Sequence, residues 1–496
     1  MQGTAQREFL KLQRTNGLPP ALSRFASSWE EGRSGVANRQ AIEVTTARED
    51  SRPTKMQASF LFDLVSFNRA TFRRMSENII APNPWMMLPF VLLLGAMAFA
   101  PSFAGNWWSR HYPKVALGLG VITLGYYLLV LGASDRVLHV AHDYVCFIML
   151  VGSLFVVSGG IHINVKGEAT PLANVMFLLV GAVLANFLGT TGAAMLLIRP
   201  WIRMNKYRVT AHHIVFFIFI IANVGGCLTP IGDPPLFLGY LQGVPFWWVA
   251  EHCWPMWATG IGLLLAMFYV VDRVNFGRAP RKVREMETEH EIWKFDGLVN
   301  LAFLAVILGA VFINKPVFLR EAVMLAAALG SYFTTARSVH EANRFHFHPI
   351  REVAILFIGI FATMIPVLDW LGANARELLG QNPAPGIFYF STGMLSGVLD
   401  NAPTYLSFLS ALFGTSGANG MGELLSGNAL NLVAISVGAV FFGAATYIGN
   451  GPNFMVKAMA DHEKIHTPTF SGFIFKFTLP FLLPVLAAVW LIFFNG

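Results

Sequence analysis

The chain has 496 residues, of which 55% are hydrophobic and only 13% are charged, and its formal net charge is +7. Soluble globular proteins carry about 25% charged residues, so this composition excludes a soluble enzyme. The positive residues stand in short clusters between apolar stretches, as in the cytoplasmic loops of membrane proteins. There is no basic domain and no nucleic-acid-binding motif, which argues against nucleic acid as a partner.

Residues 1–56 are polar, rich in arginine and serine, and show no hydrophobic periodicity. They contain no apolar segment of the kind found in secretory signals. We expect a disordered N-terminal tail, and Met56 could itself be the initiator. A weak additional helix over 57–80 is an open alternative for the segment that follows.

Ten stretches after this tail are long enough to cross a bilayer, which takes about 20 mostly apolar residues. They cover approximately 84–103, 113–132, 143–163, 210–240, 256–272, 296–314, 320–336, 352–370, 429–460 and 470–494.

Two further apolar stretches, 172–199 and 386–413, are each interrupted near the middle. The first interruption reads Gly-Thr-Thr-Gly at 189–192, and the second reads Asp-Asn-Ala-Pro at 400–403. We interpret both as re-entrant hairpins whose tips end near the middle of the membrane.

Two of the long stretches are also broken, at 223–235 and at 443–453, by runs rich in glycine and proline. Proline removes a backbone donor and clashes with the preceding turn, and glycine weakens a helix. We therefore expect two discontinuous helices in addition to the two hairpins.

The same order of predicted elements occurs in both halves of the sequence. Three spans, a hairpin, a broken helix and a further span precede the loop 273–295, and the same series follows it. Since a hairpin returns to the side it entered from, each series crosses the membrane five times, and consecutive series have opposite orientations. The sequence predicts an all-α polytopic membrane protein with inverted-topology repeats at 57–272 and 296–496, joined by a cytoplasmic linker loop at 273–295.

Broken backbone is tolerated at membrane depth only within protein or around a wet cavity. Four breaks at matching positions of two repeats therefore predict a binding site for a transported solute. Oxygen-bearing side chains dominate these breaks, which suits sodium better than zinc or copper. The candidate ion- or substrate-binding residues are Thr190, Thr191, Asn223, Thr229, Asp233, Asp400, Asn401, Thr404, Thr446, Asn450 and Asn453.

Asp400 and Asp233 are the acidic residues inside the breaks. An intramembrane carboxylate costs about 3 kcal/mol on insertion scales, so it indicates function. Such a group could hold a proton or a sodium ion in turn, which suffices for antiport. Alternatively, each aspartate could cap the half-helix that follows it, and the two roles are compatible. Lys457 could neutralise a carboxylate of the empty site, or extend to the membrane interface. The proton-coupling candidates are thus Asp400, Asp233 and Lys457, and the sodium candidates are Thr190, Asp233, Asp400 and Asn401.

Segments 187–192 (FLGTTG), 229–233 (TPIGD) and 399–404 (LDNAPT) resemble the ion transporter superfamily. Within it, the chain looks most like the NhaD-type sodium/proton antiporters and related citrate transporter-like proteins, over about 84–494. This resemblance implies inverted repeats, a homodimer and an elevator-type movement. The sodium/dicarboxylate branch carries Ser-Asn-Thr at its hairpin tips, whereas this chain has an aspartate at the second tip, which would repel a dicarboxylate and suits a cation.

We therefore expect a secondary active transporter without a cofactor, not an enzyme, in a bacterial inner membrane. The leading hypothesis is sodium/proton antiport, in which H⁺ and Na⁺ or Li⁺ compete for Asp400, with Asp233 as the secondary carboxylate. The alternative is sodium-coupled symport of an organic anion such as citrate or a dicarboxylate. An intramembrane enzyme has little support, because no GxSxG motif and no paired-aspartate arrangement is present.

Overall fold

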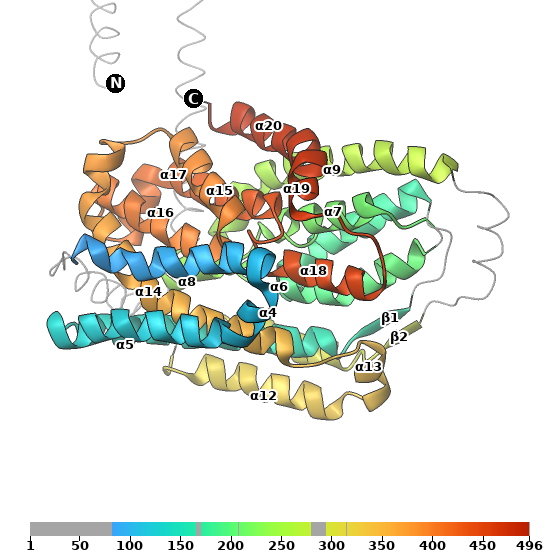
Figure 1. Cartoon of the computed structure of the whole chain (residues 1–496), viewed down its shortest axis with the longest axis horizontal. Coiled ribbons are helices and arrows are strands. Elements are labelled where there is room, and N and C mark those ends of the chain that lie inside the picture. Colours follow the sequence, from blue (N-terminus) through green and yellow to red (C-terminus); the bar gives the residue numbers. More distant parts are fainter. Residues whose placement is uncertain (1–81, 165–169, 207, 279–293, 314, 496) are drawn as a thin grey trace, which may run out of the picture. The chain divides into compact units, whose positions relative to one another are not determined.

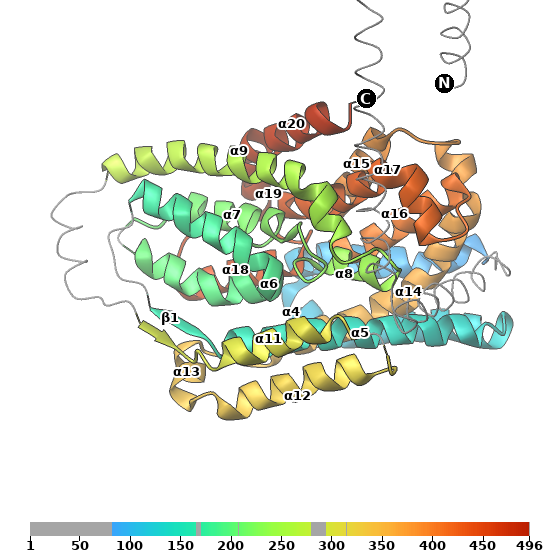
Figure 2. The ribbon, with the colours of Figure 1, turned by 180° about the vertical axis from the view of Figure 1, so that it is seen from behind.

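A computed structural model describes residues 82–164, 170–206, 208–278, 294–313 and 315–495 (Figures 1 and 2). The predicted tail 1–56, the optional helix over 57–80 and most of the predicted linker loop lie outside the described residues.

Helices make up most of the described chain. Eight are long and apolar enough to cross a membrane: Pro84–Pro101, Phe103–Val130, Ser134–Gly159, Pro171–Met204, Trp248–Arg278, His348–Leu379, Met421–Ala445 and Phe470–Phe493. Shorter apolar helices cover Ala211–Gly226 and Asn300–Ala310. The protein is an all-α polytopic membrane protein, as predicted.

The elements before the predicted linker are η1 (Pro84–Met87), α4 (Leu88–Gly125), η2 (Tyr126–Val130), α5 (Ser134–Gly159), β1 (His162–Asn164), α6 (Pro171–Met204), α7 (Ala211–Ile220), η3 (Val224–Gly226), α8 (Pro234–Leu241) and α9 (Trp248–Arg278). Those after it are β2 (Lys294–Asp296), α11 (Asn300–Ala310), α12 (Leu319–Thr334), α13 (Arg337–Ala342), α14 (His348–Leu379), α15 (Pro385–Val398), α16 (Asn401–Ser416), α17 (Met421–Phe442), η4 (Gly443–Ala445), α18 (Gly451–His462), α19 (Phe470–Phe473), η5 (Ile474–Leu482) and α20 (Leu483–Phe493).

Helix α4 contains the first two predicted spans, folded against each other. Ala104 alone has non-helical dihedral angles, φ −142° and ψ 46°. The N–H of Asn83, at the start of the first arm, donates to the Tyr126 hydroxyl, at the end of the second, at 3.1 Å. The residues between the two predicted spans are therefore helical, with one sharp bend at Ala104.

Helix α6 is the first hairpin. Gly189 has φ 71° and ψ 155°, which reverses the chain. The side chains of Asn174 and Asn205, 31 positions apart, hydrogen-bond at 2.9 Å, whereas a straight helix would separate them by about 46 Å. A Cβ atom at Gly181 would likewise lie 3.1 Å from the Leu197 side chain. Although α6 is long enough to span, its two arms therefore lie side by side.

The second predicted hairpin consists of α15 and α16, which are joined at Leu399 and Asp400, both in extended conformation. The two predicted broken helices are also present. The first consists of α7 and α8 with η3 between them, and the second of α17 and α18 with η4 between them. Prolines open α8 and α18, where a backbone donor has no helical partner to lose.

We call α4, α5, α11, α12 and α14 the scaffold helices; α4, α5, α12 and α14 lie alongside one another in Figures 1 and 2. Small residues allow α4 and α14 to approach closely, since a Cβ atom at Gly359 would lie 2.9 Å from Ala116. A short antiparallel pair, β1 with β2, also joins the chain after α5 to the chain before α11. The sequence gave no sign of these strands.

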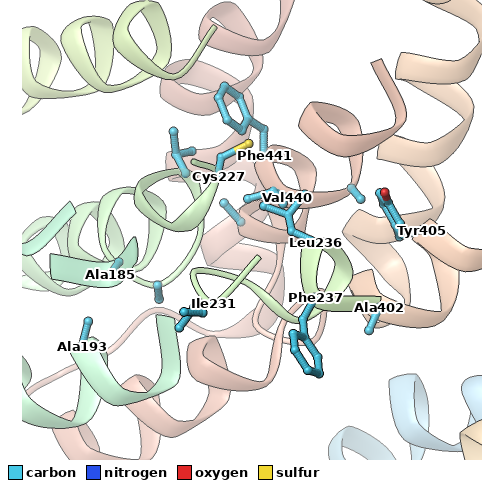
Figure 3. Close-up of a cluster of buried hydrophobic side chains, with 14 of the residues drawn as sticks. Ala185, Ala193, Cys227, Ile231, Leu236, Phe237, Ala402, Tyr405, Val440 and Phe441 are labelled. Atoms are coloured by element: carbon cyan, nitrogen blue, oxygen red, sulfur yellow. The ribbon is translucent and has the colours of Figure 1, made fainter. Parts of the chain in front are cut away.

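The hairpins and broken helices, α6 to α8 and α15 to α18, form what we call the break-bearing helices. Helix α7 is buried along nearly its whole length, as expected for a helix that is apolar on every face. Figure 3 shows apolar side chains of the first break, α8, α16 and α17 gathered where these elements meet, among them Ile231, Leu236, Tyr405 and Val440. The breaks are thereby shielded from solvent.

Candidate functional site

Asp233 lies at the centre of the breaks and is fully buried. It occupies the N-cap position of α8, yet its carboxylate makes no capping hydrogen bond. Instead Oδ1 accepts hydrogen bonds from the Thr190 hydroxyl at 2.7 Å and from the Asn450 amide at 3.1 Å. Oδ2 accepts a hydrogen bond from the side-chain amide of Asn401. One carboxylate therefore joins the first hairpin tip, the second hairpin tip and both broken helices.

Each hairpin tip is held on the break of its own half by the same backbone contact. The N–H of Thr190 donates to the carbonyl of Gly232 at 2.7 Å, and the N–H of Asn401 donates to the carbonyl of Gly449 at 3.2 Å. Glycine is required at both acceptor positions, because the chain doubles back on itself there. A Cβ atom at Gly449 would lie 2.6 Å from the carbonyl oxygen of Gly443.

A threonine in each break makes a second matching contact. The Thr229 hydroxyl donates to the carbonyl of Asn186 at 2.6 Å, and the Thr446 hydroxyl donates to the carbonyl of Gly397 at 2.8 Å. Both threonines are predicted site residues. The structure places their hydroxyls between hairpin and break, where they hold the tips in position.

Asp400 lies at the second tip, as predicted, and is 8% exposed. Its Oδ1 accepts the N–H of Ala402 at 3.0 Å, so it caps α16. The Thr404 hydroxyl donates to the Asp400 backbone carbonyl at 2.9 Å, within the helix. The capping alternative considered for both aspartates thus holds for Asp400 and not for Asp233.

Asn223 and Asn453 complete the cluster. The amide of Asn223 donates to the side-chain oxygen of Asn453 at 2.7 Å, and the amide of Asn450 donates to the side-chain oxygen of Asn223 at 3.2 Å. Six of the predicted residues therefore form one hydrogen-bonded network: Thr190, Asn223, Asp233, Asn401, Asn450 and Asn453.

One polar atom of this network has no partner among the described residues: Oδ1 of Asn401, which is buried. A buried acceptor left without a hydrogen bond costs about 1–3 kcal/mol. The atom belongs to the same side chain that donates to Asp233. An oxygen with a free lone pair thus lies next to a carboxylate.

A cavity of about 20 Å³ adjoins the first tip. It lies between Gly189, Thr190 and Thr191 of the tip, Gly232 of the first break, and Leu154 of the scaffold helix α5. Its size matches a single water molecule or a small ion. Thr191, a predicted site residue, lines this cavity.

Asn186 is a site residue that the sequence analysis left out of its candidate set. Its side-chain amide donates to the carbonyl of Gly225 at 2.7 Å, and its side-chain oxygen accepts the N–H of Leu228 at 2.9 Å. It therefore fixes the first tip to the first break. The available signal was an asparagine within an otherwise apolar helix, three residues before the turn at Gly189.

The chain was compared with known proteins. Residues 80–494 match the model of a family described as "Putative citrate transport". The chain belongs to this family. No curated protein matches it. The match places the chain in the ion transporter superfamily indicated by its hairpin motifs, and both the family and the fold are those of a membrane transporter.

Lys457 forms no hydrogen bond with Asp233 or Asp400 in this transporter. Its ammonium group forms an ion pair with Asp461, one turn further along α18, and lies 5.6 Å from the ring centre of Tyr447. Among the described residues, no lysine or arginine is a hydrogen-bond partner of Asp233 or Asp400.

One other cluster has spacing suited to a metal. Ligand atoms of His212, His213 and Asp272 lie within 4.8 Å of one another. Arg208, however, hydrogen-bonds to both oxygens of the Asp272 carboxylate. A guanidinium ion already balances that charge, so the cluster is a buried ion pair at the base of the first hairpin.

The letters His-Glu-x-x-His occur at 462–466, a pattern that binds zinc when both histidines lie on one helix face. Helix α18 ends at His462, and Lys464 has φ 60°, so the chain turns before His466. The two histidines do not share a helix face, and the pattern is a turn in this transporter.

Proposed function

We propose that the protein is a sodium/proton antiporter of the NhaD type, in which Asp233 holds a sodium ion and a proton in turn. The observation that carries this proposal is the fully buried Asp233 carboxylate, which is bound by amide and hydroxyl donors and by no cationic side chain among the described residues. A buried negative charge of this kind requires a cation or a proton as its partner.

Helix ends around the site support a cation as the cargo. The second arm of α6 and helices α8, α16 and α18 all begin at the network. Helix N-termini favour negative charge, and in many transporters they attract an anionic substrate. Here the Asp233 carboxylate occupies that place, so the protein itself supplies the anion.

Oxygen atoms around Asp233 fit a hard cation. The unpaired Oδ1 of Asn401 and the hydroxyl of Thr190 lie beside the carboxylate, and neither is a sulfur or imidazole ligand. Asp400, at the same tip as Asn401, adds a second carboxylate to the site. Binding of Na⁺ requires Asp233 to be ionised. Protonation of Asp233 removes its charge and thereby releases Na⁺.

Citrate symport is the second candidate, favoured by the description of the family. A citrate ion at this site would meet the carboxyl groups of Asp233 and Asp400 without an arginine or lysine to offset them among the described residues. Like charges in a low-dielectric site repel strongly. The geometry therefore favours the antiport hypothesis over the symport hypothesis.

We further propose that the two halves are inverted repeats and that the break-bearing helices slide along the scaffold helices within a homodimer in a bacterial inner membrane. Few polar side chains bridge the two groups. Gln242, just after α8, donates to Asp143 of α5 at 3.0 Å. Arg344, just before α14, forms an ion pair of 3.2 Å with Glu463 at the end of α18. The exposed ion pair can break at small cost, and the other contact is a single hydrogen bond, so few polar contacts oppose a sliding movement.

Transport by the purified full-length protein in proteoliposomes tests the proposal. A pH gradient is imposed, and Na⁺, Li⁺, K⁺ and radiolabelled citrate are supplied in parallel. We expect Na⁺ and Li⁺ to collapse the gradient, K⁺ to have no effect and citrate not to accumulate. Sodium-driven citrate uptake without gradient collapse would replace antiport by symport.

A further inference from the structure

Asn223 and Asn453 form a direct bridge between the two breaks. They are 230 positions apart, are fully buried, and are joined by a hydrogen bond of 2.7 Å. Both were predicted as ion ligands from their position. Their hydrogen bonds indicate a different role.

The polar atoms of both amides are already in use. The Nδ2 atom of Asn453 donates to the carbonyls of Gly443 and Thr446, both at 2.8 Å, and its Oδ1 accepts from Asn223. The Nδ2 atom of Asn223 also donates to the carbonyl of Ile218 at 2.8 Å. An amide binds a cation only through its oxygen, which has two lone pairs, and in both residues this oxygen already accepts one buried hydrogen bond from the neighbouring break. Asn401 differs, because its oxygen has no partner among the described residues.

The carbonyls bound by this pair lie next to the breaks. Ile218 is near the end of α7, and Gly443 and Thr446 follow the end of α17. A carbonyl group without a hydrogen-bond partner at membrane depth is strongly destabilising, because no water is available there. The bridge therefore stabilises the ends of both half-helices and fixes them relative to each other.

Asn450 extends the bridge to the proposed ion site. Its amide lies 3.2 Å from the side-chain oxygen of Asn223 and 3.1 Å from Oδ1 of Asp233. A continuous series of side chains, Asn453 to Asn223 to Asn450 to Asp233, thus alternates between the two halves. A proton on Oδ1 of Asp233 would weaken the hydrogen bond that this oxygen accepts from Asn450. The Asn450 amide could then bond more strongly to the side-chain oxygen of Asn223.

We propose that Asn223 and Asn453 are positioning residues, which join the two breaks and link them through Asn450 to the charge on Asp233, and that neither is an ion ligand. This inference rests on the proposed cation site at Asp233. It predicts that loss of the bridge slows exchange, whereas loss of a ligand weakens sodium binding.

The test compares Asn223→Ala, Asn453→Ala, the double variant and Asn401→Ala in full-length protein. Exchange kinetics give Vmax and the KM for Na⁺, and thermal unfolding without Na⁺ gives stability. For either bridge variant we expect Vmax to fall about 10-fold with KM changed less than about 3-fold, whereas Asn401→Ala raises KM about 10-fold or more. The double variant should lose less unfolding temperature than the sum of the two single losses, because both single variants remove the hydrogen bond between Asn223 and Asn453.

A 10-fold rise in KM for either bridge variant, or additive losses of unfolding temperature in the double variant, would overturn the inference. If the alanine variants do not fold, serine replacements, which retain one donor, are judged by the same two outcomes. Failure of the antiport proposal is recognised separately: wild-type protein would then show no sodium-dependent exchange, while the unfolding cycle would still report on the bridge.

Discussion

Asp233 and Asn450 occupy the same position in the two breaks, 217 residues apart, and their side chains hydrogen-bond to each other at 3.1 Å. Each follows a glycine whose carbonyl accepts the N–H of a hairpin tip, and each precedes a half-helix opened by proline. The surrounding backbone contacts match, but the first break has a carboxylate at this position and the second has an amide. The pair therefore carries one negative charge. Two aspartates at these positions would repel each other, and two asparagines would carry no charge.

Replacement of Asp233 by asparagine should therefore abolish sodium/proton exchange. Asp233→Asn removes the charge that compensates the cation and leaves the side-chain shape unchanged. Without this charge the cation has no counter-ion and the site has no titrating carboxyl group, so we expect exchange to fall by about 100-fold or more. Exchange in proteoliposomes measures the effect, and size-exclusion profiles confirm folding. Asp461→Asn, at the surface ion pair with Lys457, is the matched control and should keep wild-type exchange. Sodium exchange retained in Asp233→Asn would exclude this carboxylate as the ion site.

Replacement of Asp400 should have a milder effect. Asparagine is as good an N-cap as aspartate, so Asp400→Asn keeps the hydrogen bond to Ala402 and the stability of α16. Only the second carboxylate charge is lost. We expect the KM for Na⁺ to rise about 3- to 10-fold with Vmax little changed, because a nearby charge acts through a partly screened field. A complete loss of exchange with intact folding would show that Asp400, not Asp233, is the principal carboxylate.

The turn of the first hairpin depends on Gly189, whose φ of 71° is costly for any residue with a Cβ atom. A Cβ atom there would also lie 3.2 Å from the carbonyl oxygen of Ile231. We expect Gly189→Ala to destabilise the protein by about 1–3 kcal/mol and to displace Thr190, which donates to Asp233. Thermal unfolding and the KM for Na⁺ provide the measurements. Gly262→Ala in α9, where a Cβ atom meets nothing within 4 Å, should not lower the unfolding temperature.

The architecture was largely predictable because chain interruptions are local features. The first break is identified by Pro234 and Pro235 without knowledge of the fold. The turn of the first hairpin is identified in the same way by Gly189 and the two threonines that follow it. The bend between the first two spans is different, because it is made at a single residue, Ala104, without glycine or proline at that position, and the sequence did not locate it.

The arrangement within the site was not predictable in the same way. That Asp233 contacts both hairpin tips depends on distances between segments 43 and 168 positions apart, whereas Asp400 caps the helix that directly follows it. Sequence patterns place an aspartate before each of these half-helices, and from them we expected Asp400 to be the principal carboxylate, whereas our proposal gives that role to Asp233. Lys457 illustrates the same limit, since its partner Asp461 lies four residues away on an exposed part of α18.

A sliding movement can be tested by joining the two helix groups. In a background with Cys146, Cys227 and Cys253 replaced, Gln242→Cys and Asp143→Cys are connected by a bifunctional thiol reagent. Exchange should stop after cross-linking and recover when a cleavable reagent is reduced, because α8 is then fixed to α5. The control pair Gly120→Cys and Ala362→Cys joins α4 to α14, where a Cβ atom at Gly120 would lie 3.3 Å from that of Ala362. Both helices belong to the scaffold, so exchange should continue. Equal activity of the two cross-linked proteins would exclude the sliding movement.

The ion pair of Arg208 with Asp272 provides a prediction about stability that is independent of transport. Both side chains are almost fully buried, and Asn174 also donates to Asp272 at 2.9 Å. Asp272→Asn leaves the guanidinium group buried without its counter-charge, which should destabilise the protein by about 3–5 kcal/mol. Replacing both members, by Arg208→Met with Asp272→Leu, removes the uncompensated charge and should be less destabilising than Asp272→Asn alone. Thermal unfolding of the three proteins measures this order. A double variant less stable than Asp272→Asn would indicate that the residues act separately, for instance through the contacts of Asp272 with the neighbouring histidines.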